Sequence, residues 1–142
     1  MIPYADSSFL VSLYLTDRHS ADARRRVVTA PRIWCTPLHI AEWTHALSQH
    51  VFRGELQAAD FRKIEQDFEN DLRAGVWERV ALPDKAWELC ADLARRHGGK
   101  LGTRTLDSLH VACALGLGAQ QFWTFDDRQS KLAKAAGLRT SS

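Results

Sequence analysis

The spacing of apolar residues along the chain predicts helices that alternate with short strands. After Asp6, for example, Phe9, Leu10 and Leu13 recur at intervals that place their side chains on one face of a helix. By this pattern helices are expected over residues 7–15, 20–29, 37–51, 57–74, 84–97, 106–117 and 127–136. Short apolar segments bounded by turn residues predict strands over residues 2–5, 32–35, 77–82 and 121–125.

Strands that alternate with helices favour a parallel sheet, because each parallel connection has to cross a face of the sheet. We therefore expect an α/β fold, specifically a three-layer α/β/α sandwich with a central parallel sheet. The 142 residues contain no repeat, low-complexity tract or linker, and 45% are hydrophobic and 25% charged. The whole chain, residues 1–142, is expected to form a single domain.

Capping residues predict the limits of the helix that contains Asp107 and of the helix before it. Thr105 is expected to be the N-cap of the Asp107 helix, and Gly118 is expected to end it. The pair Gly98-Gly99 is expected to end the preceding helix, because glycine is a poor helix former.

Four acidic residues lie at the end of a predicted strand or early in a predicted helix: Asp6, Glu42, Asp107 and Asp126. Taken singly, each is explained as a helix cap or a first-turn acid, which the helix dipole favours. Ligands of parallel sheets, however, bind at the carboxyl ends of the strands. The predicted fold would therefore bring the four acids to one edge of the sheet.

Four carboxylates at one sheet edge would suit a hard divalent cation, which prefers oxygen ligands. Such an ion neutralises a phosphate and activates a water molecule, and phosphodiester hydrolysis requires both. The sequence shows neither a Ser-His-Asp or Cys-His arrangement nor a Gly-rich phosphate loop. A metal ion is therefore the expected source of catalysis.

The segments around these acids resemble the PIN-domain nucleases, and most closely the VapC-type toxins of type II toxin–antitoxin systems. They read YADSSFLVSLY, PLHIAEWTHAL, TRTLDSLHVACA and FWTFDDRQSKLAKAAGL. The resemblance implies an endoribonuclease that uses Mg²⁺ or Mn²⁺. Its metal ligands would be Asp6, Glu42, Asp107 and Asp126. Asp127 would be an alternative or outer-shell acid, and Ser8 and Thr124 would be polar residues that support the acids.

The same resemblance implies two protein partners, a cognate antitoxin and a second copy of the chain in a homodimer. The antitoxin is expected to lay an apolar segment over a groove near the helices at 7–15 and 57–74. It would also insert an arginine into the acidic pocket, where a charge-assisted hydrogen bond is favourable. For the RNA substrate, Arg104 and Arg128 are candidate phosphate contacts, because both are close in sequence to the acids.

The histidines near the acids are not expected to bind a metal ion. His110 lies on the apolar face of its predicted helix and is interpreted as a core residue without a catalytic role. His39, Glu42 and His45 are spaced i, i+3 and i+6, and the last position lies well round the helix from the first. No transition-metal site is therefore expected there.

The composition and a few single residues bear on the cellular compartment and on alternative functions. Cys35, Cys90 and Cys113 lack paired spacing, which is typical of buried thiols in a reducing compartment. Without the pattern of a signal peptide or a membrane span, the protein is expected to be cytoplasmic and to make no membrane contact. A housekeeping RNA-processing nuclease and a non-catalytic RNA- or protein-binding module are the alternatives. A haloacid-dehalogenase-type phosphatase is disfavoured, because Ser8 stands where that chemistry needs a second aspartate.

Overall fold

The computed structural model describes residues 2–140 and has the expected α/β architecture, with parallel strands flanked by helices. The strands are β1 (Tyr4–Ala5), β2 (Ile33–Cys35), β3 (Trp77–Arg79), β4 (Gln121–Trp123) and β5 (Arg139–Thr140). The helices are α1 (Ser7–Tyr14), α2 (Ser20–Val27), α3 (Pro37–Phe52), α4 (Ala58–Arg73), α5 (Ala86–Leu93), α6 (Gly99–Leu101), α7 (Thr105–Gly116) and α8 (Asp127–Ala135). A short π-helical segment, Ala94–Gly98, connects α5 to α6. No helix in this part of the chain is long and apolar enough to cross a membrane.

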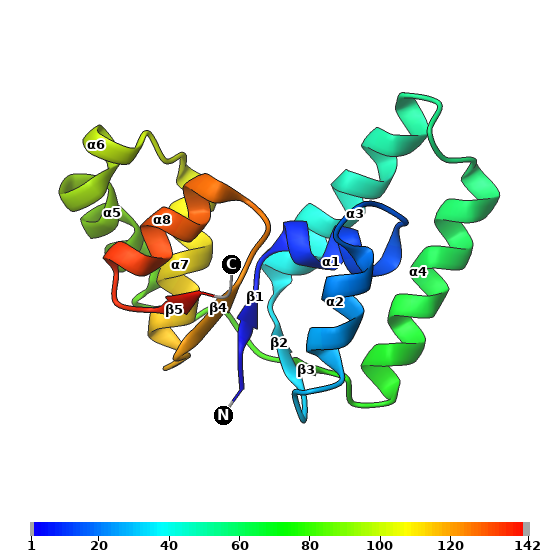
Figure 1. Cartoon of the computed structure of the whole chain (residues 1–142), viewed down its shortest axis with the longest axis horizontal. Helices are drawn as coiled ribbons and strands as arrows, with labels where there is room; N and C mark the ends of the chain where they lie inside the picture. The colour runs from blue at the N-terminus through cyan, green and yellow to red at the C-terminus, as the bar shows by residue number, and fades with distance from the viewer. Residues whose placement is uncertain (1, 141–142) are drawn as a thin grey trace.

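Within residues 2–140 the parallel strands form two hydrogen-bonded groups rather than one continuous sheet. Strands β1, β4 and β5 pair in that order, with Tyr4 opposite Phe122. Strand β2 pairs with β3, with Ile33 opposite Trp77. In Figure 1, β1 lies near the centre, with β2, β3 and α1 to α4 on one side and β4, β5 and α5 to α8 on the other. Strand β1 therefore stands where the two halves of the fold meet.

Two clusters of buried side chains stabilise the two halves, and β1 contributes to both. Successive side chains of a strand point to opposite faces, so Tyr4 packs into one cluster and Ala5 into the other. The Tyr4 ring stacks on Phe122 with the centroids 5.5 Å apart. In the other cluster, Phe9 packs against Trp123 with centroids 5.2 Å apart. The packing of β1 into both clusters therefore holds Asp6, the residue that follows this strand, in place.

The helix end predicted at Gly98-Gly99 is wrong. Gly98 and Gly99 have helical φ angles of −59° and −67°, and the chain stays helical to Leu101. The helical segment ends at Gly102, whose φ of +68° lies in the left-handed region that favours glycine. A glycine costs a helix only about 1 kcal/mol relative to alanine, which tertiary packing readily exceeds.

The predicted N-cap of α7 is also wrong, by one residue. Arg104, with extended φ and ψ of −98° and 169°, is the N-cap, and Thr105 is the first helical residue. The backbone N–H of Arg104 donates to Oδ2 of Asp107 at 3.2 Å, so this carboxylate, three residues later, satisfies the N–H of the N-cap residue. Gly118 follows the end of α7 with a φ of +78°, which confirms the predicted stop. Strand β5 could not be predicted, since two residues are too few to show an alternating pattern.

Candidate functional site

Asp6 lies at the carboxyl end of β1 and is the N-cap of α1. Its Oδ1 accepts hydrogen bonds from the backbone N–H of Phe9 at 3.0 Å and from the hydroxyl of Ser8 at 2.7 Å. Its Oδ2 accepts from the hydroxyl of Thr124 at 2.5 Å. Only 1% of Asp6 is exposed, and this burial raises the pKa of its carboxyl, although the hydrogen bonds act in the opposite direction. A cation next to Asp6 would be favourable, because it would offset the cost of a buried negative charge.

The hydroxyls of Ser8 and Thr124 connect Asp6 to the loop that follows β4. Thr124 Oγ1 accepts from the N–H of Asp126 at 3.0 Å, and Ser8 Oγ accepts from the N–H of Phe125 at 3.3 Å. Each hydroxyl thus donates to the Asp6 carboxylate and accepts from the backbone of this loop. The two polar side chains that were expected to support the acids lie against Asp6, and they join the end of β1 to the end of β4.

Glu42 lies on α3, and its side chain reaches the start of α1. Its Oε1 accepts a hydrogen bond from Ser7 Oγ at 2.7 Å and another from Nε2 of His110. Burial opposes ionisation of Glu42, but the hydrogen bond and electrostatic attraction of His110, together with the hydrogen bond from Ser7, outweigh it, so its pKa is lowered. Glu42 is therefore an ionised carboxylate that is bonded to the residue next to Asp6.

Asp107 and Asp126 each stabilise the start of their own helix. The Asp107 carboxylate binds the N–H of Arg104, and Asp126 is the N-cap of α8, where its Oδ1 accepts from the N–H of Gln129 at 2.9 Å. The buried side chain of Gln129 connects the two helix starts, since its Nε2 donates to the carbonyl oxygen of Asp107 at 3.0 Å. Neither carboxylate is bonded to another acid or to its supporting hydroxyls.

The fold thus brings some of the predicted site residues together in two small groups. It does not gather the carboxylates of all four acids into one cluster. Asp6 contacts Ser8 and Thr124, and Glu42 contacts Ser7. Across residues 2–140, no group of three or more His, Cys, Asp or Glu side chains is close enough to hold a metal ion. Mg²⁺ in proteins is commonly bound by one or two carboxylates, with water and substrate phosphates in the other positions. The oxygen donors therefore fit such an ion chemically, although they form no preorganised cage.

The remaining predicted site residues lie at the surface beside these acids. Arg104 precedes α7, and Asp127 and Arg128 are the first two residues of α8. All three side chains are exposed. The two arginines are therefore accessible to the backbone of a nucleic acid.

His110 makes the contact that the sequence interpretation missed. It is 3% exposed, which confirms its place in the core, but Nε2 contacts Glu42 and Nδ1 lies 2.7 Å from the Tyr4 hydroxyl. The available signal was a titratable side chain on an apolar helix face, three residues after Asp107. Elsewhere, His39 and His45 bind the backbone carbonyl oxygens of Ala5 and Ala41.

The chain matches the family model of the PIN domain over residues 4–135, and it belongs to that family. Solved structures share its fold. The VapC20 toxin of Mycobacterium tuberculosis, which cleaves the sarcin–ricin loop, has a TM-score of 0.70 at 18% identity, with 96% of each chain covered. FitAcB from Neisseria gonorrhoeae has a TM-score of 0.74 at 10% identity, covering 99% of this chain and 97% of the other.

A third similar structure is that of VapBC2 from Rickettsia felis, bound to a DNA fragment from its promoter. It has a TM-score of 0.68 at 14% identity and covers 99% of this chain and 98% of the other. No protein with a curated description matches the sequence. At these identities the structural similarities establish the fold alone.

Proposed function

We propose that this chain is a Mg²⁺- or Mn²⁺-dependent endoribonuclease that hydrolyses RNA phosphodiester bonds and acts as the toxin of a toxin–antitoxin pair. The observation that carries the proposal is the buried carboxylate of Asp6 at the end of β1, held by Ser8 and Thr124. Glu42 is bonded to the next residue, Ser7. Acids at the carboxyl ends of parallel strands occupy the usual ligand position of an α/β fold. Membership of the PIN family supports the same function.

The ion would be held by Asp6, Glu42, Asp107 and Asp126, with Asp127 as an alternative acid. A bound divalent ion neutralises the phosphate and lowers the pKa of the attacking water. The chain's own residues orient the carboxylates. Ser8 and Thr124 fix both oxygens of Asp6, and Gln129 sets the start of α7 against the start of α8.

Exposed arginines beside the acids would bind the RNA backbone. Arg104 and Arg128 lie at the starts of α7 and α8, which Gln129 holds together. Their guanidinium groups match the geometry of phosphate oxygens and would place the phosphodiester over the acidic site. This binding is expected to weaken as the salt concentration rises, because it releases counterions from the RNA.

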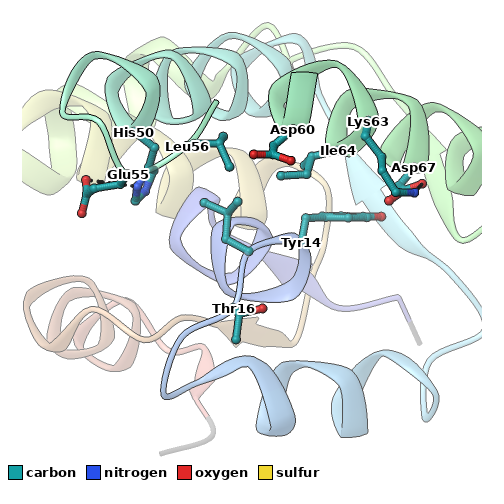
Figure 2. Close-up of a pocket in the computed structure, with 10 residues that line it drawn as sticks. Tyr14, Thr16, His50, Glu55, Leu56, Asp60, Lys63, Ile64 and Asp67 are labelled. Carbon is teal, nitrogen blue, oxygen red and sulfur yellow. Dashed lines mark ion pairs between the residues drawn. The ribbon is translucent and has the colours of Figure 1, made fainter. Parts of the chain in front are cut away.

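We assign the antitoxin to a groove of about 490 Å³ between the end of α1 and the hairpin of α3 and α4 (Figure 2). Its apolar lining includes Tyr14, Leu15, Leu56 and Ile64. Of its acidic residues, Glu55 pairs with His50 and Asp67 with Lys63, which leaves Asp60 without an ion pair among the described residues. An extended or helical segment that is apolar and carries a basic residue would complement the apolar lining and Asp60. This groove lies at the helices predicted to bind the antitoxin, and an arginine of the same partner would reach the acidic site.

We further propose that the protein forms a homodimer and acts in the cytoplasm, on RNA. Cys35, Cys90 and Cys113 are buried free thiols, which a reducing compartment preserves.

RNA cleavage by the purified protein tests the enzymatic proposal. We expect cleavage with Mg²⁺, no cleavage with EDTA, and no cleavage by Asp6→Ala or Asp107→Ala. Asp84→Ala is the matched control, because Asp84 is an exposed acid outside the site network. Cleavage that survives both EDTA and the two substitutions would overturn the mechanism.

Expression in bacteria tests the toxin role separately. We expect growth arrest that is relieved by co-expression of a small protein encoded beside the gene. An active nuclease that leaves growth unchanged would indicate a housekeeping RNA-processing role. If Asp107→Asn arrests growth as strongly as the wild type, the protein is a non-catalytic binding module.

A further inference from the structure

Tyr4, His110 and Glu42 form a line of hydrogen bonds that runs from β1 through α7 to α3. The Tyr4 hydroxyl lies 2.7 Å from Nδ1 of His110, and Nε2 of the same ring contacts Oε1 of Glu42. The three residues come from three elements on both sides of the molecule, as Figure 1 shows for α3 and α7. Ring contacts hold the imidazole in place, with centroid distances of 5.8 Å to Tyr4 and 5.2 Å to His39.

Hydrogen bonds at both ring nitrogens fix the orientation of the His110 imidazole. An ionised carboxylate only accepts hydrogen bonds, so Nε2 has to donate to Glu42. On the other side of the ring, Nδ1 is hydrogen-bonded to the buried Tyr4 hydroxyl, which is also bonded to Cys113. The imidazole is therefore held at both nitrogens, with Nε2 directed at Oε1 of Glu42.

The polar ring of His110 lies in an otherwise apolar stretch of α7. The residues that follow it, Val111 to Ala114, are all completely buried. A polar group in such a place costs free energy unless its nitrogens are hydrogen-bonded. Tyr4 and Glu42 provide one partner for each nitrogen, which a residue that merely fills the core would not need.

We propose that Tyr4 and His110 are positioning residues that orient the Glu42 carboxylate for cation binding, an inference that rests on the proposed function. Ser7 and His110 both donate to Oε1 of Glu42. Each carboxylate oxygen has two lone pairs, so these donors use the capacity of Oε1 and leave Oε2 for a cation. Partners that orient metal ligands in this way typically contribute about 10- to 100-fold to metal affinity.

Conservative variants separate positioning from packing. Tyr4→Phe removes the hydroxyl and keeps the ring that stacks on Phe122. His110→Gln keeps an amide N–H near the place of Nε2, whereas His110→Asn is too short to reach Glu42. Thr44→Val is the matched control, because it removes another hydroxyl near Glu42 on α3, one bonded to the carbonyl oxygen of Ile40.

The first measurement is the Mn²⁺ affinity of the metal-free full chain, obtained by calorimetric titration. Circular dichroism first confirms that each variant is folded. We expect Mn²⁺ binding to weaken by about 10- to 100-fold in Tyr4→Phe and His110→Asn. We expect His110→Gln to recover most of the loss and Thr44→Val to match the wild type. Unchanged Mn²⁺ affinity in a folded His110→Asn protein overturns the positioning role, even if the wild type cleaves RNA.

Nitrogen NMR of His110 in the metal-free protein gives a second measurement that needs no activity. In the wild type we expect Nε2 to carry a proton that is hydrogen-bonded to Glu42. A wild-type ring without a proton on Nε2 overturns the inference and leaves the nuclease proposal intact. A wild type that neither binds Mn²⁺ nor cleaves RNA overturns the proposed function, and the positioning role fails with it.

Discussion

Nε2 of His39 donates to the carbonyl oxygen of Ala5 at 2.7 Å, which joins the start of α3 to the end of β1. Nδ1 of the same ring accepts from the backbone N–H of Thr36, the N-cap of α3, at 3.0 Å. Within residues 2–140, β1 and β2 belong to different hydrogen-bonded groups, so this histidine spans the junction between them. Asp6 follows Ala5 and Glu42 follows His39 by three residues. The contact therefore sets the relative position of the two acids.

The buried state of His39 predicts a stability that depends on pH. Burial lowers the pKa of its imidazole from 6.5 to about 3. Because the folded pKa is below the unfolded one, the unfolded state takes up the proton first on acidification. The contribution of His39 to stability is thus complete above about pH 6.5 and is lost as the pH falls toward about 3. Its slope is at most about 1.4 kcal/mol per pH unit.

Urea unfolding of the wild type and His39→Gln between about pH 7 and about pH 4 measures this slope. Glutamine keeps an N–H for the Ala5 carbonyl oxygen but does not titrate. We expect the variant to be less stable at neutral pH and to lose less stability on acidification. Parallel stability curves for the two proteins would show that His39 is not held neutral in the folded state.

Thr124→Val is expected to destabilise the protein by about 1–3 kcal/mol, because it leaves the buried Asp6 carboxylate and the N–H of Asp126 without their hydroxyl partner. The Thr124 hydroxyl donates to Oδ2 of Asp6 and accepts from the N–H of Asp126, and valine has the same shape without it. Thr124→Ser keeps the hydroxyl and is the control. Urea unfolding should show that Thr124→Ser is more stable than Thr124→Val. A valine variant as stable as the serine variant would show that these bonds contribute nothing.

Alanine substitutions at Gly116 and Gly99 are expected to have opposite effects. A Cβ at Gly116 would lie 2.9 Å from Cβ of Pro83, too close for two carbon atoms, so we expect a loss of about 1–3 kcal/mol. A Cβ at Gly99 meets nothing within 4 Å, and its backbone is helical. Gly99→Ala should therefore gain about 0.5–1 kcal/mol through the lower entropy of the unfolded chain. Thermal unfolding checks both, and a destabilised Gly99→Ala or a neutral Gly116→Ala contradicts this packing.

Local signals were enough to predict where the acids stand on the fold. Asp6 follows β1 directly and Asp126 follows β4 after two residues, and parallel strands bring such ends to one edge. The same reasoning placed the N-cap of α7 at Thr105 instead of Arg104, because hydroxyl side chains favour that position and arginine gives no such signal.

Contacts between distant segments were out of reach of the sequence patterns. His110 was correctly expected in the core, but its bonds to Tyr4 and Glu42 join residues 106 and 68 positions apart. Gln129 gave no signal at all, and its side chain connects the starts of α7 and α8. Such partners are set by how helices pack on the strands, which periodicity does not encode. The orientation of the acids was thus less predictable than their position.

Asp6→Asn tests whether the buried carboxylate of Asp6 is kept for a cation at the expense of stability. Burial raises its pKa, so the carboxyl favours folding at low pH and this contribution is lost as the pH rises through the folded pKa. Near neutral pH the ionised group is therefore destabilising when no cation is bound. Asparagine has a similar size and no charge. We expect the metal-free variant to be at least as stable as the wild type in urea unfolding with EDTA.

Mn²⁺ is expected to reverse the order of stability of the wild type and Asp6→Asn. A ligand that binds only the folded state stabilises it by about 2.7 kcal/mol when present at about 100 times its dissociation constant. The wild type should gain this stability, and Asp84→Asn should gain it equally, because Asp84 is an exposed acid outside the network. Asp6→Asn should gain little, because it lacks the carboxylate. An Asp6→Asn protein that Mn²⁺ stabilises as much as the wild type would remove Asp6 from the ligand set.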